Sequence, residues 1–297
     1  MSKDLSDVIG RVIPAPENFL SPEKLEQARK ARRSFMGKAL AMGAGVAASA
    51  GAATRAMAAD GEEAILKLPE HSTGLGQAVA MEDGYGKPSK WETNLRRRQS
   101  PGLTRVDQAS VSFTPLQGLF GIITPSGLHF ERHHQGWWDI DPSKHRLMIN
   151  GLVKRQRVFT MDDLMRLPSV SRIHFIECGA NSATEWGNVA VPTVQYSHGM
   201  VSCSEFTGVL LSTLLEMCGI DKKKAKYVLA EGADGSSMTR TIDIERAMDD
   251  CIVAWAMNGE MLRPENGYPL RLVVPGIQGV SWVKYLRRIE VGDQKYA

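Results

Sequence analysis

Polar residues that could do chemistry stand where apolar segments of this sequence end. The first is Cys178, which closes an apolar segment and is followed by the small residues Gly179-Ala180-Asn181. A cysteine thiolate in a loop can bind a soft metal, and small neighbours let a bulky group approach the sulfur. The alternative interpretation is a cysteine that only packs as a small apolar side chain.

Two further groups bring cations together. Phe130-Glu131-Arg132-His133-His134 places a guanidinium beside two imidazoles, and Arg271 and Lys284 flank the segment Val273-Val274-Pro275-Gly276. Such cations suit a phosphate or another anion. Asp234, in a Glu-Gly-Ala-Asp-Gly turn, adds a hydrogen-bond acceptor. Taken alone, the histidine pair could equally be a zinc site or a surface loop.

The elements that would position these groups are short strands mixed with short helices. A helix is expected to begin at residue 161 with Thr160 as its cap, and Gly219 is expected to close another over residues 204 to 218. A helical turn is expected over 244 to 248. Strands are expected over 147 to 153, 172 to 178, 227 to 231, 251 to 257 and 270 to 276. Because strands and helices do not alternate regularly, the pattern predicts an α+β fold.

Residues 1–58 have the pattern of a twin-arginine export signal. Arg32 and Arg33 precede an Ala/Gly-rich run, and Arg55 stands before Ala56-Met57-Ala58. The run is poor in Leu and Ile, and it is shorter than the roughly 20 apolar residues that span a bilayer, which disfavours a membrane anchor. We therefore expect a protein exported folded to the periplasm, with no membrane association once mature. Export in the folded state favours a redox cofactor inserted in the cytoplasm.

Composition narrows the function classes. The 297 residues include 36 Lys+Arg and 33 Asp+Glu, of which the export signal holds nine and five, so the remainder is close to neutral. Without a basic face or zinc-finger spacing, nucleic-acid binding is set aside. Four cysteines without a Cys-x-x-Cys spacing argue against covalent haem and iron-sulfur clusters. Disulfides stay open, although a chain folded in the reducing cytoplasm must be stable before they form.

Residues 59–111 are rich in Gly, Pro and charge and are expected to form an extended N-terminal arm. This arm contains Arg96-Arg97-Arg98, which is either a solvated stretch or a docking patch.

The order of these segments resembles the molybdopterin domain of the sulfite oxidase family over about residues 112 to 292. Five segments occur in that family's order: Arg132-His133-His134, Cys178-Gly179-Ala180-Asn181, Glu231-Gly232-Ala233-Asp234, Met257-Asn258-Gly259 and Pro269-Leu270-Arg271-Leu272-Val273-Val274-Pro275-Gly276. The resemblance implies a Mo-molybdopterin cofactor with Cys178 as the thiolate ligand of molybdenum and Arg132 as a second catalytic residue. The cofactor-binding residues that it implies are Phe130, Arg132, His133, Cys178, Asp234, Asn266, Arg271, Trp282, Val283 and Lys284.

The resemblance also sets expectations for the domains. Residues 112–297 are expected to form the molybdopterin-binding oxidoreductase domain. In the family a C-terminal immunoglobulin-like dimerisation domain follows, and this chain, which ends at Ala297, does not contain it. We therefore expect a C-terminally truncated form of the domain.

Departures from the family pattern indicate the substrate. Sulfite oxidases usually carry arginines where this chain has Ser182, Ala183 and Ser281. Free sulfite is largely dianionic near neutral pH, so a pocket without these cations favours a less charged sulfur group. Residues 178–188, with Trp137-Trp138-Asp139, resemble the SoxC-type subunits of sulfane dehydrogenases.

This resemblance implies oxygen-atom transfer to a sulfane sulfur that a carrier protein holds on a cysteine during thiosulfate oxidation. Because the sequence has no haem motif, electrons would pass to a separate c-type cytochrome subunit. A periplasmic sulfite dehydrogenase and an inactive pterin-binding scaffold are the alternatives.

Overall fold

The computed structural model describes residues 88–89, 91–92, 95–100, 107–186, 191–236 and 238–295. The chain divides into two units, Met1–Tyr85 and Gly86–Ala297, and the described residues belong to the second. The predicted export signal lies outside the described residues. Within the described ranges, none of the helices has the length and apolar character needed to cross a membrane.

Three sheets form the described unit. A three-stranded sheet has the order β1-β2-β3, one five-stranded sheet has the order β11-β10-β7-β6 with β12 also paired to β10, and the other has the order β5-β4-β13-β8-β9. The strands are β1 Arg98–Gln99, β2 Val111–Phe113, β3 Glu131–Arg132, β4 Leu147–Gly151, β5 Arg157–Phe159, β6 Val170–Glu177, β7 Val201–Leu210, β8 Tyr227–Gly232, β9 Thr239–Asp243, β10 Ile252–Met257, β11 Glu260–Met261, β12 Arg271–Val273 and β13 Leu286–Gly292. Among these strands, β4 and β13 pair in parallel, with Met148 opposite Arg288.

Helices of the described residues are few and short, which together with the mixed sheets confirms the α+β class. They are α4 Met161–Met165, α5 Val194–His198, α6 Leu211–Cys218 and α7 Ile244–Asp249, with the 3₁₀ turns η3 Asp107–Ala109, η4 Leu116–Gly118, η5 Ser126–Leu128, η6 Ala183–Trp186, η7 Pro264–Asn266 and η8 Gly279–Ser281. The predicted cap of α4 is confirmed, because the Thr160 side chain and Asp163 form a reciprocal capping box. Gly219 closes α6 with φ 71°, in the left-handed region that favours glycine.

The helix predicted over residues 204 to 218 is wrong in its first half. Residues Val201–Leu210 form β7, and α6 begins only at Leu211. Burial alternates along β7, but its first two inward positions are serines, Ser202 and Ser204. The Ser202 hydroxyl lies 2.7 Å from the Thr114 hydroxyl and accepts a hydrogen bond from the Phe130 N–H. Because these inward residues are polar, the period-two pattern of a strand was hidden in the sequence.

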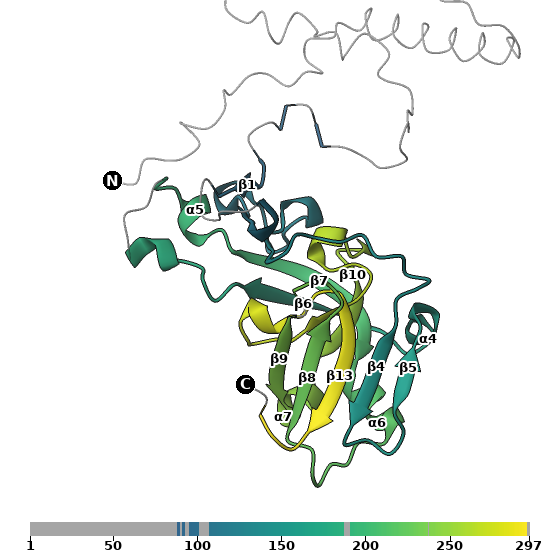
Figure 1. Cartoon of the computed structure of the whole chain (residues 1–297). Helices are drawn as coiled ribbons and strands as arrows, with labels where there is room; N and C mark the ends of the chain where they lie inside the picture. The colour runs from purple at the N-terminus through teal and green to yellow at the C-terminus, as the bar shows by residue number, and fades with distance from the viewer. Residues whose placement is uncertain are drawn as a thin grey trace, which may run out of the picture. The chain divides into compact units, whose positions relative to one another are not determined.

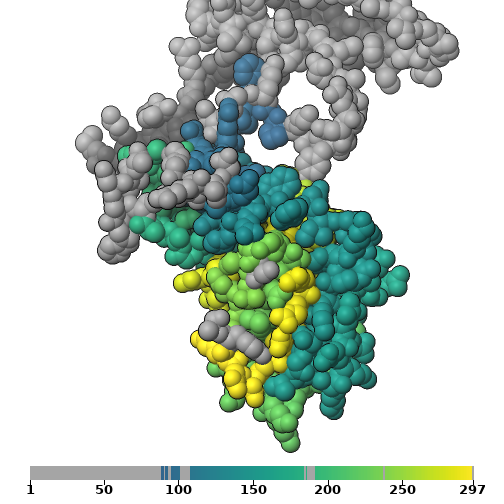
Figure 2. All heavy atoms as spheres, viewed as in Figure 1, coloured from purple at the N-terminus to yellow at the C-terminus, as the bar shows by residue number. Residues whose placement is uncertain are grey.

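The strands of the β5-β4-β13-β8-β9 sheet stand side by side, and β6 and β7 run across one end of it (Figure 1). Leu147 of β4, Ile289 of β13 and Leu214 of α6 are fully buried in the common core, and each such side chain contributes roughly 1.5–3 kcal/mol through burial. In Figure 2 the teal atoms of the β4–β5 region adjoin the green and yellow atoms of later strands. The core thus gives the loops at this end of the sheet a rigid base.

Candidate functional site

A cavity of about 360 Å³ lies where residues around β3, the end of β6, the turn after β8 and the segment from β12 to β13 meet. Its volume falls within the roughly 300–1,000 Å³ of small-molecule sites. All ten predicted site residues line it: Phe130, Arg132, His133, Cys178, Asp234, Asn266, Arg271, Trp282, Val283 and Lys284. The structure therefore brings together residues that span more than half of the chain, while their individual roles stay predictions.

Cys178 stands directly after β6, in a loop that hydrogen bonds hold firmly. Its N–H donates to the Met200 carbonyl at 3.0 Å. The Asn181 amide donates to the Glu177 carboxylate and accepts from the Met200 N–H, both at 3.0 Å. The thiol of Cys178 is free and partly exposed. Gly179 and Ala180, which line the cavity beside it, are exposed. All four cysteines are free, so the structure contains no disulfide among them.

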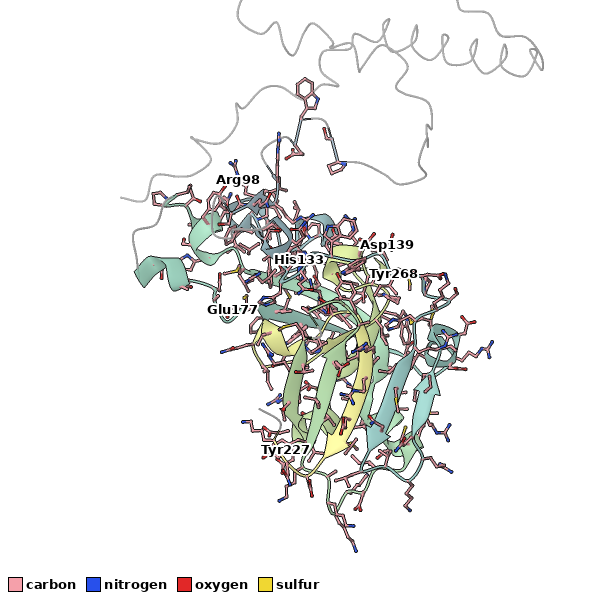
Figure 3. The ribbon with its side chains drawn as sticks, viewed as in Figure 1. Arg98, His133, Asp139, Glu177, Tyr227 and Tyr268 are labelled. Carbon is pink, nitrogen blue, oxygen red and sulfur yellow. The ribbon has the colours of Figure 1, made fainter. Side chains whose placement is uncertain are left out.

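The turn η8 packs directly against the end of β6. A Cβ atom on Gly279 would lie 3.0 Å from the Glu177 carbonyl oxygen, and one on Gly179 would lie 2.6 Å from Oε1 of Gln278. Only glycine permits this approach of the two segments without movement. Figure 3 shows Glu177 and His133 near the same end of the β5-β4-β13-β8-β9 sheet, with Tyr227 at the opposite end of that sheet.

Arg271 is the most deeply buried cation of the cavity, with 4% of the residue exposed. Its guanidinium donates to the carbonyls of Asn266 and Trp282, at 2.9 and 3.1 Å. Burial lowers the pKa of Arg271 to about 10, so the side chain remains charged at neutral pH. Among the described residues no carboxylate pairs with it, and its Nε has no hydrogen-bond partner. A buried cation of this kind favours an anionic ligand.

The Asn266 side chain adds a second unpaired polar atom to the same wall. It is buried, and its Oδ1 has no hydrogen-bond partner among the described residues. The wall therefore offers a donor at Arg271 Nε and an acceptor at Asn266 Oδ1, which a ligand with both kinds of polar group could satisfy.

Lys284 is the first member of a short chain of hydrogen bonds that runs through His133 to Glu131. Its Nζ donates to Nδ1 of His133 at 2.9 Å, and Nε2–H of His133 donates to Oε2 of Glu131 at 2.8 Å. Burial, followed by the charge of Arg271, lowers the pKa of Lys284 to about 7. Burial and the charge of Lys284 lower the pKa of His133 to about 3. His133 is therefore a neutral imidazole whose acceptor nitrogen faces the lysine.

The remaining predicted residues complete the walls. Arg132 donates from its guanidinium to the His133 carbonyl, and Asp234 accepts a hydrogen bond from the Ser236 hydroxyl at 2.5 Å. The indole N–H of Trp282 donates to the Ile277 carbonyl, and its ring packs edge-on against Phe206. Trp282 and Val283 are buried and give this side of the cavity an apolar surface.

The structure separates the two histidines of the pair. His133 is buried and hydrogen-bonded, whereas His134 is exposed at the cavity wall. Across the described ranges, no group of three or more His, Cys, Asp or Glu side chains could hold a metal ion. The zinc interpretation of the pair thus gains no support, and a metal bound at Cys178 would need its other ligands from a bound cofactor.

Among the cavity residues that sequence reasoning missed are the polar side chains of His129, Glu265 and Gln278. His129 is buried, its Nδ1–H donates to the Phe130 carbonyl at 2.8 Å, and burial lowers its pKa to about 3. Its position next to the segment 130–134 was the one available signal. Glu265 and Gln278 lie in turns without a recognisable pattern, so the sequence held no indication of them.

The positions where the chain lacks the family's arginines do not line the cavity of the described structure. Ala183 is exposed at the start of η6, and Ser182 precedes it with φ 63°. Ser281 is buried in η8, where its N–H donates to the Gln278 carbonyl. In the chain, Ser182 and Ala183 follow Cys178 by four and five residues, and Ser281 directly precedes Trp282.

Most of the residues that line the cavity lie in a segment that matches a known protein family. Residues 134–297 match the model of the family described as the oxidoreductase molybdopterin binding domain. The NADPH nitrate reductase of Phytophthora infestans is 36% identical over 193 residues, which are 61% of this chain and 21% of that protein. The NADH nitrate reductase of Solanum lycopersicum is 39% identical over 197 residues, which are 61% of this chain and 22% of that protein.

Among solved structures, the sulfane dehydrogenase SoxCD from Paracoccus pantotrophus superposes with a TM-score of 0.76 at 41% identity. The match covers 80% of this chain and 60% of that chain. The chain thus spans about a fifth of the length of the nitrate reductases and three fifths of the sulfane dehydrogenase chain that it matches.

Proposed function

Because this chain belongs to the sulfite oxidase type of oxidoreductase molybdopterin-binding family, we propose that it is the molybdenum subunit of a periplasmic sulfane dehydrogenase. It would oxidise a sulfane sulfur held on the cysteine of a carrier protein and pass electrons to a c-type cytochrome subunit. The observation that carries this proposal is the 41% identity to the sulfane dehydrogenase structure across 80% of the chain.

Domains of this family bind molybdopterin, and the cavity fits such a group. Molybdopterin carries a phosphate and a polar ring system, for which Arg271 offers an unpaired buried N–H and Asn266 an unpaired buried oxygen. Lys284 and Arg132 add positive charge, and Cys178 offers a soft thiolate ligand that suits molybdenum. On this basis Arg132, Arg271 and Lys284 would hold the anionic part of the cofactor, and Cys178 would bind the metal.

When bound, the cofactor supplies oxygen-atom transfer and two-electron redox chemistry. The protein groups orient the reactants and stabilise charge. Arg132, half-buried in the cavity wall, would stabilise the negative charge that develops on the oxidised sulfur. Trp282 and Val283 exclude water from one side, which strengthens these electrostatic interactions.

The absence of arginines at two positions favours a sulfane, which carries less charge, over the free sulfite dianion. Where sulfite oxidases carry arginines, the structure has the exposed Ala183 and the buried Ser281, and neither can neutralise a dianion. Nitrate reduction is a second candidate, because nitrate reductases are 36% and 39% identical over three fifths of the chain. The sulfane dehydrogenase is favoured because its identity is 41% and its structure superposes with a TM-score of 0.76 over 80% of this chain.

Turnover of the purified holoprotein with a c-type cytochrome as acceptor tests the proposal. We expect electrons to reach the cytochrome with a carrier-bound sulfane, more slowly with free sulfite, and no oxidation of a reduced electron donor by nitrate. The Cys178→Ser variant, matched in size, controls for adventitious metal. Preferential turnover of nitrate, or of free sulfite, would overturn the sulfane assignment, and cofactor-loaded protein inactive with all three would support a pterin-binding scaffold.

Export is part of the same proposal and is tested separately. Replacing both Arg32 and Arg33 by lysine should leave folded, cofactor-loaded protein in the cytoplasm, because the paired guanidinium groups are the recognition feature. Cell fractionation reads the outcome, and efficient export of this variant would contradict the signal assignment.

A further inference from the structure

Of the three consecutive arginines in the N-terminal arm, Arg97 is partly buried, whereas Arg96 and Arg98 are exposed. Residues 95–100 run beside β2, and Arg98 of β1 pairs with Phe113. The Gln195 side-chain amide of α5 donates to the carbonyls of Arg96 and Phe113, both at 2.8 Å. Strand pairing on one side and this double hydrogen bond on the other fix the backbone at Arg97.

The Arg97 guanidinium joins two carboxylates that belong to different walls of the cavity. It forms an ion pair with Glu131 of β3 and lies 3.6 Å from Oε1 of Glu265 in η7. The Arg97 side chain is 24% exposed and each carboxylate side chain 17%. Burial lowers the pKa of Arg97, but an arginine stays charged in proteins. We call Arg97, Glu131 and Glu265 the Arg97 bridge.

Both ends of the Arg97 bridge hold Lys284. On the Glu131 side, Oε2 accepts from Nε2–H of His133, which fixes the tautomer that leaves Nδ1 free to accept from Lys284 Nζ. On the Glu265 side, the same Nζ donates to the Glu265 carbonyl at 3.2 Å. The lysine head is therefore located by these two contacts, each one step from Arg97, and by a third to the Arg132 carbonyl at 3.4 Å.

Removal of the Arg97 charge would leave two carboxylates facing each other in a partly buried place. Such a pair is costly, because each carboxylate loses its compensating cation. Glu131 and Glu265 would then be free to turn toward other cations, among them Lys284, on which the charge of Glu265 already acts, and the position of the lysine head would change.

We propose that Arg97 is a positioning residue of the cofactor site: through Glu131 and Glu265 it holds His133 and Lys284, so that the lysine stays directed at the anionic part of the cofactor. This inference rests on the proposed cofactor but not on the proposed substrate. It also assigns the arginine run a role inside the protein, where the sequence had suggested a solvated stretch or a docking patch.

The test compares Arg97→Gln with Arg98→Gln, a matched change at the next residue, which is exposed in β1. Purified holoproteins are diluted, and the rate of molybdopterin release is followed by the fluorescence of its oxidised form. We expect release at least tenfold faster for Arg97→Gln, within about threefold of wild type for Arg97→Lys, and unchanged for Arg98→Gln. Equal release rates for Arg97→Gln and Arg98→Gln would overturn the proposal.

A second readout does not depend on the cofactor. In cofactor-free protein labelled with ¹⁵N-histidine, the ring nitrogen shifts of His133 report which nitrogen carries the proton. Wild type and Arg98→Gln should show the Nε2–H tautomer, and Arg97→Gln should show a mixture. An unchanged His133 tautomer in a folded Arg97→Gln protein would contradict the bridge, whereas wild-type protein that never acquires molybdopterin would contradict the proposed function instead.

Discussion

At the scale of single residues, the cavity holds two cations in different ways. Arg271 donates to backbone carbonyls and stays charged. Lys284 donates a hydrogen bond to His133, and its pKa is lowered to about 7. Arg271 thus provides a fixed charge, and Lys284 provides one that depends on pH. The two should respond differently to mutation and to pH.

Arg271→Lys should lower cofactor occupancy more than a conservative change normally would. A lysine cannot donate to the Asn266 and Trp282 carbonyls and to a ligand in the planar geometry of a guanidinium. The lost hydrogen bonds to buried groups correspond to about 1–3 kcal/mol, or about a tenfold to hundredfold weaker hold on the cofactor. Elemental analysis of molybdenum per chain measures it. Arg288→Lys, at a guanidinium that pairs with Glu231, is the control, and equal occupancy in both variants would contradict the role of Arg271.

Cofactor release should accelerate as the pH rises above 7. The anionic cofactor favours the charged form of Lys284, and in the free protein burial lowers the pKa of this lysine to about 7. Above pH 7 binding must therefore take up a proton, which weakens affinity by up to about tenfold per pH unit. Release measured at pH 6.5 and 8.5 reads this effect, and Lys284→Arg should remove the pH dependence because arginine stays charged. A wild-type rate that does not change with pH would exclude Lys284 as a ligand of the anion.

In the cofactor-free protein, Lys284 should make the free energy of unfolding depend on pH in the opposite direction. Because the folded pKa of Lys284 lies below its ordinary value of 10.5, the unfolded chain binds the extra proton between about pH 7 and 10.5. Stability from this group is therefore lowest below pH 7 and recovers as the pH rises through that window. High pH thus favours the empty fold while it disfavours the bound cofactor.

Sequence reasoning found the residues whose neighbours in the chain carry a pattern. Cys178, Arg132 and Arg271 stand in motifs that a family resemblance can match, and all three line the cavity. Arg97 and Glu265 could not be found in this way, because their meeting depends on the pairing of β1 with β2 and on the fold of η7. Contacts between side chains far apart in sequence follow from the tertiary structure and leave no local signal.

At the scale of elements, the end of β6 sets the position of the thiol. Asn181 bonds back to Glu177 and across to Met200, so one side chain ties the loop of Cys178 to β6 and to the residue before β7. The strand itself was predicted from its apolar run, within two residues of its observed start at Val170. The polar inward face of β7, by contrast, concealed a strand that the sequence suggested to be helical.

Asn181→Ala should loosen this loop. It removes two hydrogen bonds, one to a carboxylate, and should lower the free energy of unfolding by about 1–2 kcal/mol, with a reduced molybdenum content. Denaturant unfolding of the cofactor-free protein measures the first effect, and elemental analysis the second. Asn181→Asp keeps the acceptor for the Met200 N–H and should lose less stability. Wild-type stability and metal content in Asn181→Ala would show that the loop is held by other contacts.

At the scale of the described unit, chain segments distant in sequence build one site on a common core. The segment around β3 brings Arg132, the end of β6 brings Cys178, and the segment from β12 to β13 brings Arg271 and Lys284. The α+β class and the strands β4, β6, β8, β10 and β12 were predictable from local patterns, since apolar runs bounded by turns mark them, whereas the other described strands were not predicted. The order of strands within the sheets was not, because pairing such as that of β4 with β13 joins residues far apart in the chain.

The preference for a substrate charge can be tested at Ala183, an exposed position five residues after Cys178. Ala183→Arg should raise the ratio of specificity constants for free sulfite over carrier-bound sulfane about tenfold, or about 1.4 kcal/mol, because a guanidinium at this exposed position could pair with a dianion. Ala183→Gln, which adds length without charge, is the control. The buried Ser281 is less suitable for an added arginine. An unchanged ratio in protein that keeps its molybdenum would show that shape or carrier docking decides the substrate.

The central claim is that Cys178 binds molybdenum in this cavity, and molybdenum K-edge X-ray absorption tests it most directly. Holoprotein matured in a host that makes molybdopterin should contain about one metal per chain, and its spectrum should lose one sulfur neighbour of molybdenum in the Cys178→Ser variant. Cys203→Ser, at a second partly exposed free cysteine, should leave the spectrum unchanged. A Cys178→Ser spectrum identical to that of wild type, or protein that holds no molybdenum at all, would contradict the claim.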